Sequence, residues 1–327
     1  MSSPHVLVLT RDGDGHADRV RESLVRRGVR STVFDNADYP ARSCVELAHD
    51  SRGLTRRVLY TESGPLDLDV VTAVWWRRPR PPAAHPDLTD PAVAAHTAQE
   101  AATMLSGLWE SLPCRTVPGR ESALTRARHK PTQLTLAAEL GFEIPETLIT
   151  GRAEALWDFH NRHDGHIITK PMNLPWVEDL AAGHTVIRKC EFVSGRDVAY
   201  AAGLRFCPVI AQPYVPKKIE LRVTVVGRRV FAAEIHSQDS NRAGMDWRRY
   251  DLGATRHAVH PLPDEVADRC VALTQRLGLV YGAVDLILTP DGRYVFLEIN
   301  PNGQWLWIED LTGLPISEAL CDLLVAP

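Results

Sequence analysis

The segment Tyr281–Trp305 (YGAVDLILTPDGRYVFLEINPNGQW) constrains the fold more than any other part of the chain. Its two apolar runs flank the turn residues Thr289–Gly292, a pattern that predicts an antiparallel β-hairpin. If Thr289 and Gly292 close a two-residue turn, Asp285 lies opposite Phe296. The side-chain period of two then determines which polar residues of the hairpin share a face.

Three oxygen-bearing side chains fall on one face of this hairpin: Asp285, Glu298 and Asn300. Two carboxylates about 4 Å apart repel each other by roughly 4 kcal/mol at an effective dielectric constant of about 20, so a divalent cation is a natural compensation. Mg²⁺ takes oxygen ligands and commonly shares its remaining positions with substrate phosphates. The pattern indicates a magnesium site, and the alternative is an edge hairpin whose acids face water.

Composition places the chain among ordinary globular proteins. Its 327 residues, 44% apolar and 24% charged, suit two or three modules and exclude disorder. A formal net charge of -4 gives no bulk attraction to nucleic acid, and no apolar run is long enough to span a membrane. The six cysteines are scattered without a CxxC pair, and Met1 leads directly into a strand-like run, so a reduced cytoplasmic protein is expected.

The N-terminal part has the pattern of a βαβ unit. His5–Thr10 reads as a buried strand, Ala17–Arg27 as an amphipathic helix and Ser31–Asp35 as a second strand. Between the first strand and the helix lies GDGHAD, which imitates a dinucleotide-binding fingerprint, but Asp18 occupies the third glycine position. This segment is therefore predicted to be an ordinary βα turn.

The rest of the chain alternates predicted helices and strands. A long helix is expected over Pro91–Trp109, and another from Glu121 through Lys130 to Leu140. A hairpin is expected around Leu54–Asp67, and a second with its turn at Gly227–Arg229. The fold class is thus α/β and α+β.

The C-terminal motif is recognisable. Asp285, followed by LEINP with Glu298 and Asn300, resembles the magnesium motif that closes ATP-grasp ligases. The longer form EINPNGQW with WIEDLTGLPI after it, together with WWRRP at residues 75–79, is similar to the graspetide (microviridin-type) peptide maturases. The resemblance implies an ATP-grasp fold with an N-terminal Rossmann-like pre-ATP-grasp domain (1–118), a central subdomain with the lid and two lysines (119–205) and a C-terminal subdomain with the hinge and metal site (206–327).

The same resemblance implies an ATP site with one or two Mg²⁺ ions held by Asp285, Glu298 and Asn300. Two lysines would contact the phosphates, and a hinge strand would bind adenine. An acid would bind the ribose together with one arginine, and a second arginine would contact the transferred phosphate. The residues matching these positions are Lys130, Lys170, Gln212, Pro213, Tyr214, Val215, Glu220, Arg222 and Arg248, and Asn300 is also assigned to nucleotide binding.

Some of these residues have other interpretations. Lys130 could be an exposed helix lysine, and Glu220 and Arg222 could form a cross-strand salt bridge. The small-residue lid of ATP-grasp ligases is not matched, because AAGHTVIRKCEF carries only Gly183 there. The base for the second step is not identified, and His236 is one candidate.

The resemblance implies a ligase that activates Asp or Glu side chains of a precursor peptide as acyl phosphates and joins them to Ser, Thr or Lys as esters or amides. The partner would be a peptide with a leader and an acidic core, which Arg77, Arg78 and Arg80 could help to hold, and a homodimer is expected. One alternative is a RimK-like or glutathione-synthetase-like ligase that adds a free amino acid. Another is a non-catalytic ATP-binding module, which retention of all three metal positions argues against.

Overall fold

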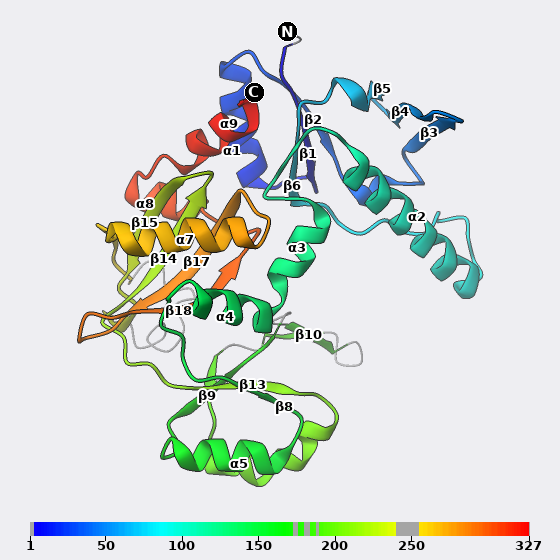
Figure 1. Cartoon of the computed structure of the whole chain (residues 1–327). Coiled ribbons are helices and arrows are strands. Elements are labelled where there is room, and N and C mark those ends of the chain that lie inside the picture. The colour runs from blue at the N-terminus through cyan, green and yellow to red at the C-terminus, as the bar shows by residue number, and fades with distance from the viewer. Residues whose placement is uncertain (1–2, 173–175, 180–183, 188–189, 240–254, 327) are drawn as a thin grey trace.

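The computed structural model describes residues 3–172, 176–179, 184–187, 190–239 and 255–326. In the view of Figure 1, an N-terminal sheet lies at the top, the sheet with the C-terminal hairpin lies in the middle, and a smaller sheet with helix α5 (Ala153–Arg162) lies at the bottom. This mixture of parallel and antiparallel sheets with helices confirms the predicted fold class.

The N-terminal sheet is parallel, with strand order β2-β1-β6-β7. Every residue of β1 is buried, as expected for a parallel strand covered on both faces. The parallel pairing of β1 with β2, joined by helix α1, confirms the predicted βαβ opening. The elements are β1 (His5–Thr10), α1 (Gly15–Arg26), β2 (Arg30–Phe34), β6 (Ala73–Arg78) and β7 (Arg115–Val117).

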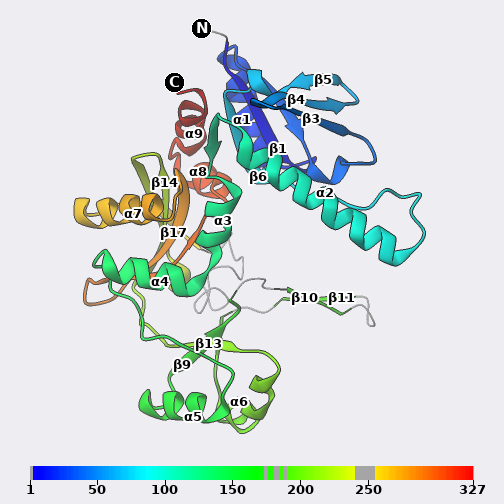
Figure 2. The same cartoon turned by 45° about the vertical axis from the view of Figure 1, so that its right-hand side comes forward.

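A second, antiparallel sheet of three strands adjoins the first. It consists of β3 (Cys44–Asp50), β4 (Gly53–Thr61) and β5 (Gly64–Asp67). The β4–β5 hairpin falls in the predicted region, but β3 was not predicted. None of the residues of β3 is buried, so the strand lacks the clear apolar alternation on which such a prediction depends. Helix α2 (Pro91–Ser111) agrees with the predicted helix and projects from this part of the molecule (Figure 2).

The single helix predicted across Lys130 is wrong. Helix α3 (Glu121–Arg128) ends before His129, whose backbone is extended, and α4 (Lys130–Glu139) starts anew. Pro131 explains the break, because inside a helix it would remove a hydrogen bond and clash with the preceding turn, whereas at the start of α4 it is tolerated. The break places Lys130 at the first position of a helix.

The small sheet has strand order β12-β9-β13-β8 and a core of its own. Its elements are β8 (Leu148–Thr150), β9 (Ile167–Lys170), β12 (Glu191–Phe192), α6 (Gly195–Ala199) and β13 (Val209–Pro213), with the β10 (Trp176–Asp179) and β11 (His184–Ile187) pair nearby. Phe159 of α5 and Ile167 are buried in this core. Short 3₁₀ helices occur at Asn36–Asp38, Leu68–Val70, Ala201–Arg205 and Ser237–Asp239.

The C-terminal sheet is antiparallel, with strand order β16-β15-β14-β17-β18. Helices α4 and α7 lie on one of its faces, and α9 lies beside α1 of the N-terminal part (Figures 1 and 2). Trp75 of β6 and Trp305, which precedes α8, share one hydrophobic core, so the two ends of the chain are packed as one body. The elements are β14 (Ile219–Val226), β15 (Arg229–Ile235), β16 (His257–Val259), α7 (Asp264–Arg276), β17 (Tyr281–Leu288), β18 (Tyr294–Asn300), α8 (Leu306–Thr312) and α9 (Ile316–Val325).

Within the described residues, no helix combines the length and the hydropathy that a membrane crossing requires.

Candidate active site

A row of charged side chains crosses three neighbouring strands of the C-terminal sheet. Arg222 of β14 pairs with Asp285 of β17, which pairs in turn with Glu298 of β18. Directly paired residues point to the same face of a sheet, so the row lies on one face. Arg222 Nη1 is 3.1 Å from Asp285 Oδ1, and both side chains are about 5% exposed. The sheet therefore holds a buried ion pair beside a second carboxylate.

The register of the β17–β18 hairpin differs from the prediction in two places. Thr289 and Arg293 close a three-residue loop instead of a two-residue turn, and Leu297 then forms a bulge in β18 beside Asp285. The predicted pairing of Asp285 with Phe296 is therefore wrong, and Asp285 pairs with Glu298. Each irregularity shifts the register by one residue, and one alone would send Asp285 and Glu298 to opposite faces. Together they keep the predicted face and set the carboxylates opposite each other.

Lys130 approaches the row from helix α4. Its Nζ lies 2.6 Å from Oε2 of Glu298, with the two side chains 15% and 12% exposed. The alternative of an exposed helix lysine is therefore wrong. The lysine pairs with the second carboxylate as Arg222 pairs with the first. Two cations and two carboxylates thus form one compact, balanced group.

Asn300, the third predicted metal ligand, begins the loop that joins β18 to α8. It pairs with Ala283 on β17, two positions along from Glu298, and therefore shares the face of the row. Its side-chain Oδ1 accepts a hydrogen bond of 3.0 Å from the backbone N–H of Asn302, and an amide oxygen has a second lone pair to offer.

This donor set fits Mg²⁺ rather than a metal held entirely by protein. No cluster of three or more His, Cys, Asp or Glu residues suited to a metal occurs among the described residues. Two carboxylates and one amide oxygen leave coordination positions for phosphates and water, as is usual for Mg²⁺. The adjacent Arg222 and Lys130 are suited to phosphate oxygens once a cation takes the carboxylates.

Glu220 lies on the same face of β14 as Arg222, two residues away. It pairs with Lys217 just before the strand and accepts a hydrogen bond of 3.2 Å from Ser237 Oγ. The alternative of a cross-strand salt bridge is confirmed for Arg222, which pairs with Asp285 on β17, whereas Glu220 pairs with Lys217. Lys217, whose side chain is 5% exposed, was not assigned a role from the sequence, where two adjacent lysines before a strand resemble a solvated pair.

The predicted hinge residues lie at the end of β13 and just after it. Gln212 is buried, and its Nε2 donates to Thr147 Oγ1 over 2.8 Å. The backbone N–H of Tyr214 donates to His166 O, and the Tyr214 ring lies 5.1 Å from that of Phe192. Pro213 pairs within the sheet without a donor of its own, and Val215 follows Tyr214 directly.

Lys170 ends β9, and its Cα pairs with that of Ile210 on the hinge strand. This confirms only that the lysine terminates a strand of the small sheet. Arg248 lies outside the described residues, as do Gly183 and Lys189 of the predicted lid segment.

His236 is engaged away from the row. Its Nε2 lies 2.8 Å from Glu234 Oε2 and 2.9 Å from a nitrogen of Arg256. Glu234 pairs with Leu221, and so lies on the face of β14–β15 opposite that of Arg222. The structure therefore gives no support to His236 as the base.

The three arginines near WWRRP have different surroundings. Arg77 is buried, and its Nε lies 3.1 Å from Asp14 Oδ2. Arg80 is bonded through its side chain and its backbone N–H to Asp35. Arg78 at the end of β6 is exposed, as Arg80 is, and is accessible to a peptide.

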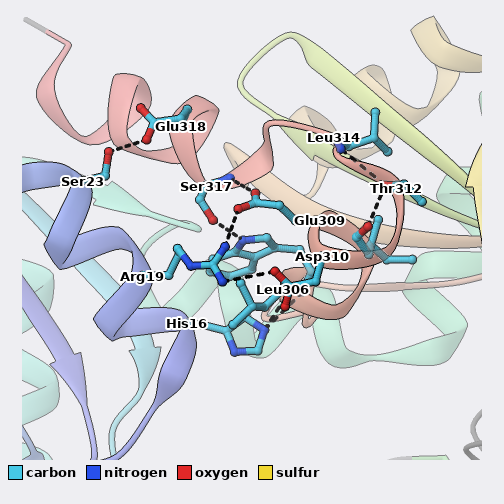
Figure 3. Close-up of polar contacts among 12 residues, drawn as sticks. His16, Arg19, Ser23, Leu306, Glu309, Asp310, Thr312, Leu314, Ser317 and Glu318 are labelled. Atoms are coloured by element: carbon cyan, nitrogen blue, oxygen red, sulfur yellow. Dashed lines mark hydrogen bonds and ion pairs between the residues drawn. The ribbon is translucent and has the colours of Figure 1, made fainter. Parts of the chain in front are cut away.

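His16 of α1 accepts hydrogen bonds from the C-terminal part (Figure 3). Its Nε2 lies 3.3 Å from the backbone nitrogens of both Trp305 and Leu306, which requires an unprotonated Nε2. Burial lowers the pKa of His16 below its ordinary value of 6.5, and the charges of Arg77 and Arg78 act in the same direction, although the hydrogen bond with Asp14 opposes them.

A pH dependence of stability follows from this arrangement. Because the folded-state pKa of His16 is depressed, its contribution is complete above 6.5 and is lost as the pH falls from 6.5 towards the lower folded-state value. The loss is at most about 1.4 kcal/mol per pH unit. We expect His16→Gln, which can still accept a hydrogen bond, to flatten the fall in unfolding free energy measured between about pH 7 and pH 5. An identical slope in both proteins would contradict this assignment.

Comparisons with known proteins find ATP-grasp proteins similar to this chain. The family model described as the MvdD pre-ATP grasp domain matches residues 5–121. The macrocyclase MdnC of Microcystis aeruginosa MRC, solved bound with the precursor peptide MdnA, is 29% identical at a TM-score of 0.87, with 99% of this chain and 100% of that chain covered. The macrocyclase MdnB of the same organism is 30% identical at a TM-score of 0.80, with the same coverage.

A RiPP-associated ATP-grasp ligase of Chryseobacterium gregarium, in complex with ADP and a leader and core peptide, is 28% identical at a TM-score of 0.89, covering 98% of this chain and 96% of that chain. The ATP-grasp ligase PsnB, solved with a minimal precursor, Mg and ADP, is 25% identical at a TM-score of 0.76, covering 100% of this chain and 98% of that chain. Human N-acetylaspartylglutamate synthase A is 24% identical over 220 residues, 65% of this chain; the chain spans about half (53%) of this curated relative.

Proposed function

Because the chain belongs to the family of ATP-grasp ligases that includes the macrocyclases MdnB and MdnC, we propose that it closes rings within a ribosomal precursor peptide. It is an ATP-dependent ligase, and ATP and Mg²⁺ are its cofactors. An Asp or Glu side chain of the peptide attacks the γ-phosphate of ATP, which forms an acyl phosphate and releases ADP. A Ser or Thr hydroxyl or a Lys amine of the same peptide then displaces phosphate, which forms an ester or an amide.

The observation that carries this proposal is the row Arg222–Asp285–Glu298 with Lys130 against it. Phosphoryl transfer depends mainly on positioning and on neutralising charge. Mg²⁺ supplies charge neutralisation at the phosphates when bound. In the proposed site, Asp285, Glu298 and Asn300 hold Mg²⁺, while Lys130 and Arg222 turn from the carboxylates to phosphate oxygens.

The remaining site residues have proposed roles in binding the nucleotide. Gln212, Pro213, Tyr214 and Val215 line the adenine side, where they follow one another along the hinge strand. Glu220 binds the ribose, Lys170 the phosphates, and Arg248 the transferred phosphate. We assign these functions to the proposed modules 119–205 and 206–327, and peptide contacts in part to the pre-ATP-grasp module 1–118. The exposed position of Arg78 supports its contact with an acidic core peptide.

The competing function is a ligase that adds a free amino acid, and the similarity to N-acetylaspartylglutamate synthase A is its specific support. The two functions change the mass of a peptide in opposite directions. We propose to incubate the protein with ATP, Mg²⁺ and acidic peptides that contain Ser, Thr or Lys, and to measure intact masses. Loss of one water per bond is expected, and chelation of Mg²⁺ by EDTA should abolish it.

Two outcomes would contradict ring closure. A gain in mass by one amino-acid residue would move the protein to the competing function, and tight ATP binding without turnover on any peptide would make it a non-catalytic module. Tandem mass spectrometry of the dehydrated product separates ring closure from simple elimination, because a ring suppresses backbone fragments between its two linked residues.

We also propose a homodimer in the cytoplasm. The free thiols of Cys44, Cys114, Cys207, Cys270 and Cys321 suit a reducing compartment. Light scattering of the purified protein measures the oligomeric state directly.

A further inference from the structure

The loop between β18 and α8 is held from the N-terminal part of the chain. Arg77 of β6 is 2% exposed, and its Nη1 donates to the backbone oxygen of Asn302 over 3.4 Å. The guanidinium carbon lies 5.5 Å from the centre of the Trp305 ring, a distance typical of cation–π contact. One side chain of the N-terminal sheet thus contacts two residues of the loop that begins with the predicted ligand Asn300.

Asp14 holds Arg77 in place. Its carboxylate forms the ion pair with Arg77, accepts from Thr10 Oγ1 over 3.0 Å, and caps α1 by accepting from the His16 N–H. Burial acts to raise the pKa of Asp14, but its contacts with His16, Arg77 and Thr10 lower it well below its usual range. Burial lowers the pKa of Arg77 to about 10, so the guanidinium stays charged at neutral pH. The segment GDGHAD therefore supplies the anchor of this arginine.

Three further polar groups in and just after the loop are also held by hydrogen bonds. Tyr281 donates its hydroxyl to Gly303 O over 2.6 Å, and burial raises the pKa of Tyr281 to about 12, so the phenol keeps its proton. His16 binds the backbone nitrogens at the end of the loop. Inside the loop, the backbone N–H of Asn302 donates to Asn300 Oδ1. Arg77 binds the backbone oxygen of this same residue, Asn302, whose N–H orients the Asn300 amide.

Packing of the N-terminal part of the chain against the C-terminal part does not require the buried Arg77. Figure 3 shows Arg19 of α1 bonded to Glu309 and Asp310 of α8, at 3.2 and 3.1 Å, and Ser23 bonded to Glu318 of α9. These contacts do not touch the loop, and they include the exposed side chains of Arg19 and Asp310. A buried ion pair contributes little net stability, because desolvating both charges offsets much of their attraction. The Arg77–Asp14 pair is therefore better explained by what Arg77 holds.

We propose that Arg77, anchored by Asp14, is a positioning residue for the metal site: through the Asn302 backbone it fixes the amide of Asn300 on the face that carries Asp285 and Glu298. This inference rests on the proposed assignment of these residues to Mg²⁺. It makes the N-terminal part of the chain a component of the metal site, although none of its residues binds the ion.

The test measures Mg²⁺-dependent ADP binding by calorimetry, without any peptide. Arg77→Lys keeps a charge beside Asp14 but lacks the second nitrogen that reaches Asn302. This variant is expected to bind ADP with unchanged affinity in EDTA. The Mg²⁺ concentration that gives half of the maximal enhancement of ADP binding should rise by about 10-fold, because Arg77 supports a metal ligand. Tyr281→Phe, which removes one hydroxyl, should raise it by roughly 3-fold for the same reason.

Arg19→Gln is the matched control, because it breaks an ion pair of the same interface without touching the loop. It should lower the thermal unfolding midpoint and leave the Mg²⁺ dependence unchanged. An unchanged Mg²⁺ dependence in Arg77→Lys, or an equal loss of ADP affinity with and without Mg²⁺, would overturn the proposal. If Arg77→Lys does not fold, Asp14→Asn, which removes the carboxylate that anchors Arg77, decides in the same way. Because no peptide is present, failure of the proposed ring closure would not affect this result.

Discussion

Replacing Glu298 by Gln is expected to reduce ATP-dependent dehydration of a substrate peptide by about 1,000-fold, equivalent to roughly 4 kcal/mol of transition-state stabilisation. Glu298 lies directly opposite Asp285 and holds Lys130 at 2.6 Å, so it joins the two halves of the proposed phosphate site. The amide keeps the shape of the side chain but removes the charge that a cation requires. Single-turnover ADP release and intact-mass spectrometry measure the loss.

A reduced rate supports the proposed role only if the variant remains folded. Glu265→Gln provides the comparison, since Glu265 is an exposed residue of α7 whose partner is Arg269 within the same helix. It should retain full activity, and both variants should keep a wild-type unfolding midpoint within a few degrees. Turnover by Glu298→Gln above about a tenth of the wild-type rate would remove Glu298 from the metal site, because such a loss corresponds to only about 1.4 kcal/mol.

The face of this carboxylate was predictable from the sequence, whereas its partner was not. Alternation along β18 places Glu298 and Asn300 together in any register. The residue opposite Glu298 depends on a three-residue loop and a bulge, each of which shifts the pairing of the two strands by one residue. The turn sequence TPDG does not distinguish these loop lengths, and a bulge depends on tertiary packing. The types of the site residues and the sheet face that they share could therefore be predicted from the sequence, whereas their cross-strand pairing could not.

Contacts between distant segments were the least predictable. Lys130 was selected by resemblance, yet its place at the start of a helix depends on Pro131, which lies inside an otherwise continuous helical pattern. GDGHAD was interpreted as a simple turn, and it forms the turn after β1 together with the start of α1. Nothing local indicates that Asp14 anchors Arg77 or that His16 binds the start of α8. Such roles appear only when the two ends of the chain are packed together.

Gly303→Ala is expected to have the second large effect. An added Cβ at this position would overlap Cβ of Ala283 on β17, and it would also contact the backbone oxygen of Asn300. Since Ala283 is fully buried in β17, the loop must move away, at a cost of about 1–3 kcal/mol in unfolding free energy. The displacement would also move the Asn300 amide, so peptide dehydration should fall by at least about 10-fold.

Two further variants separate this steric effect from a general intolerance of alanine. Gly107 lies inside α2 with no atom near its missing Cβ, so Gly107→Ala should leave activity unchanged and stabilise the protein by about 0.5–1 kcal/mol. Ala283→Gly combined with Gly303→Ala removes the overlapping methyl group and should recover activity relative to Gly303→Ala alone. Absence of recovery would mean that the loop responds to something other than its contact with β17, and that close packing against this strand does not hold Asn300 in place.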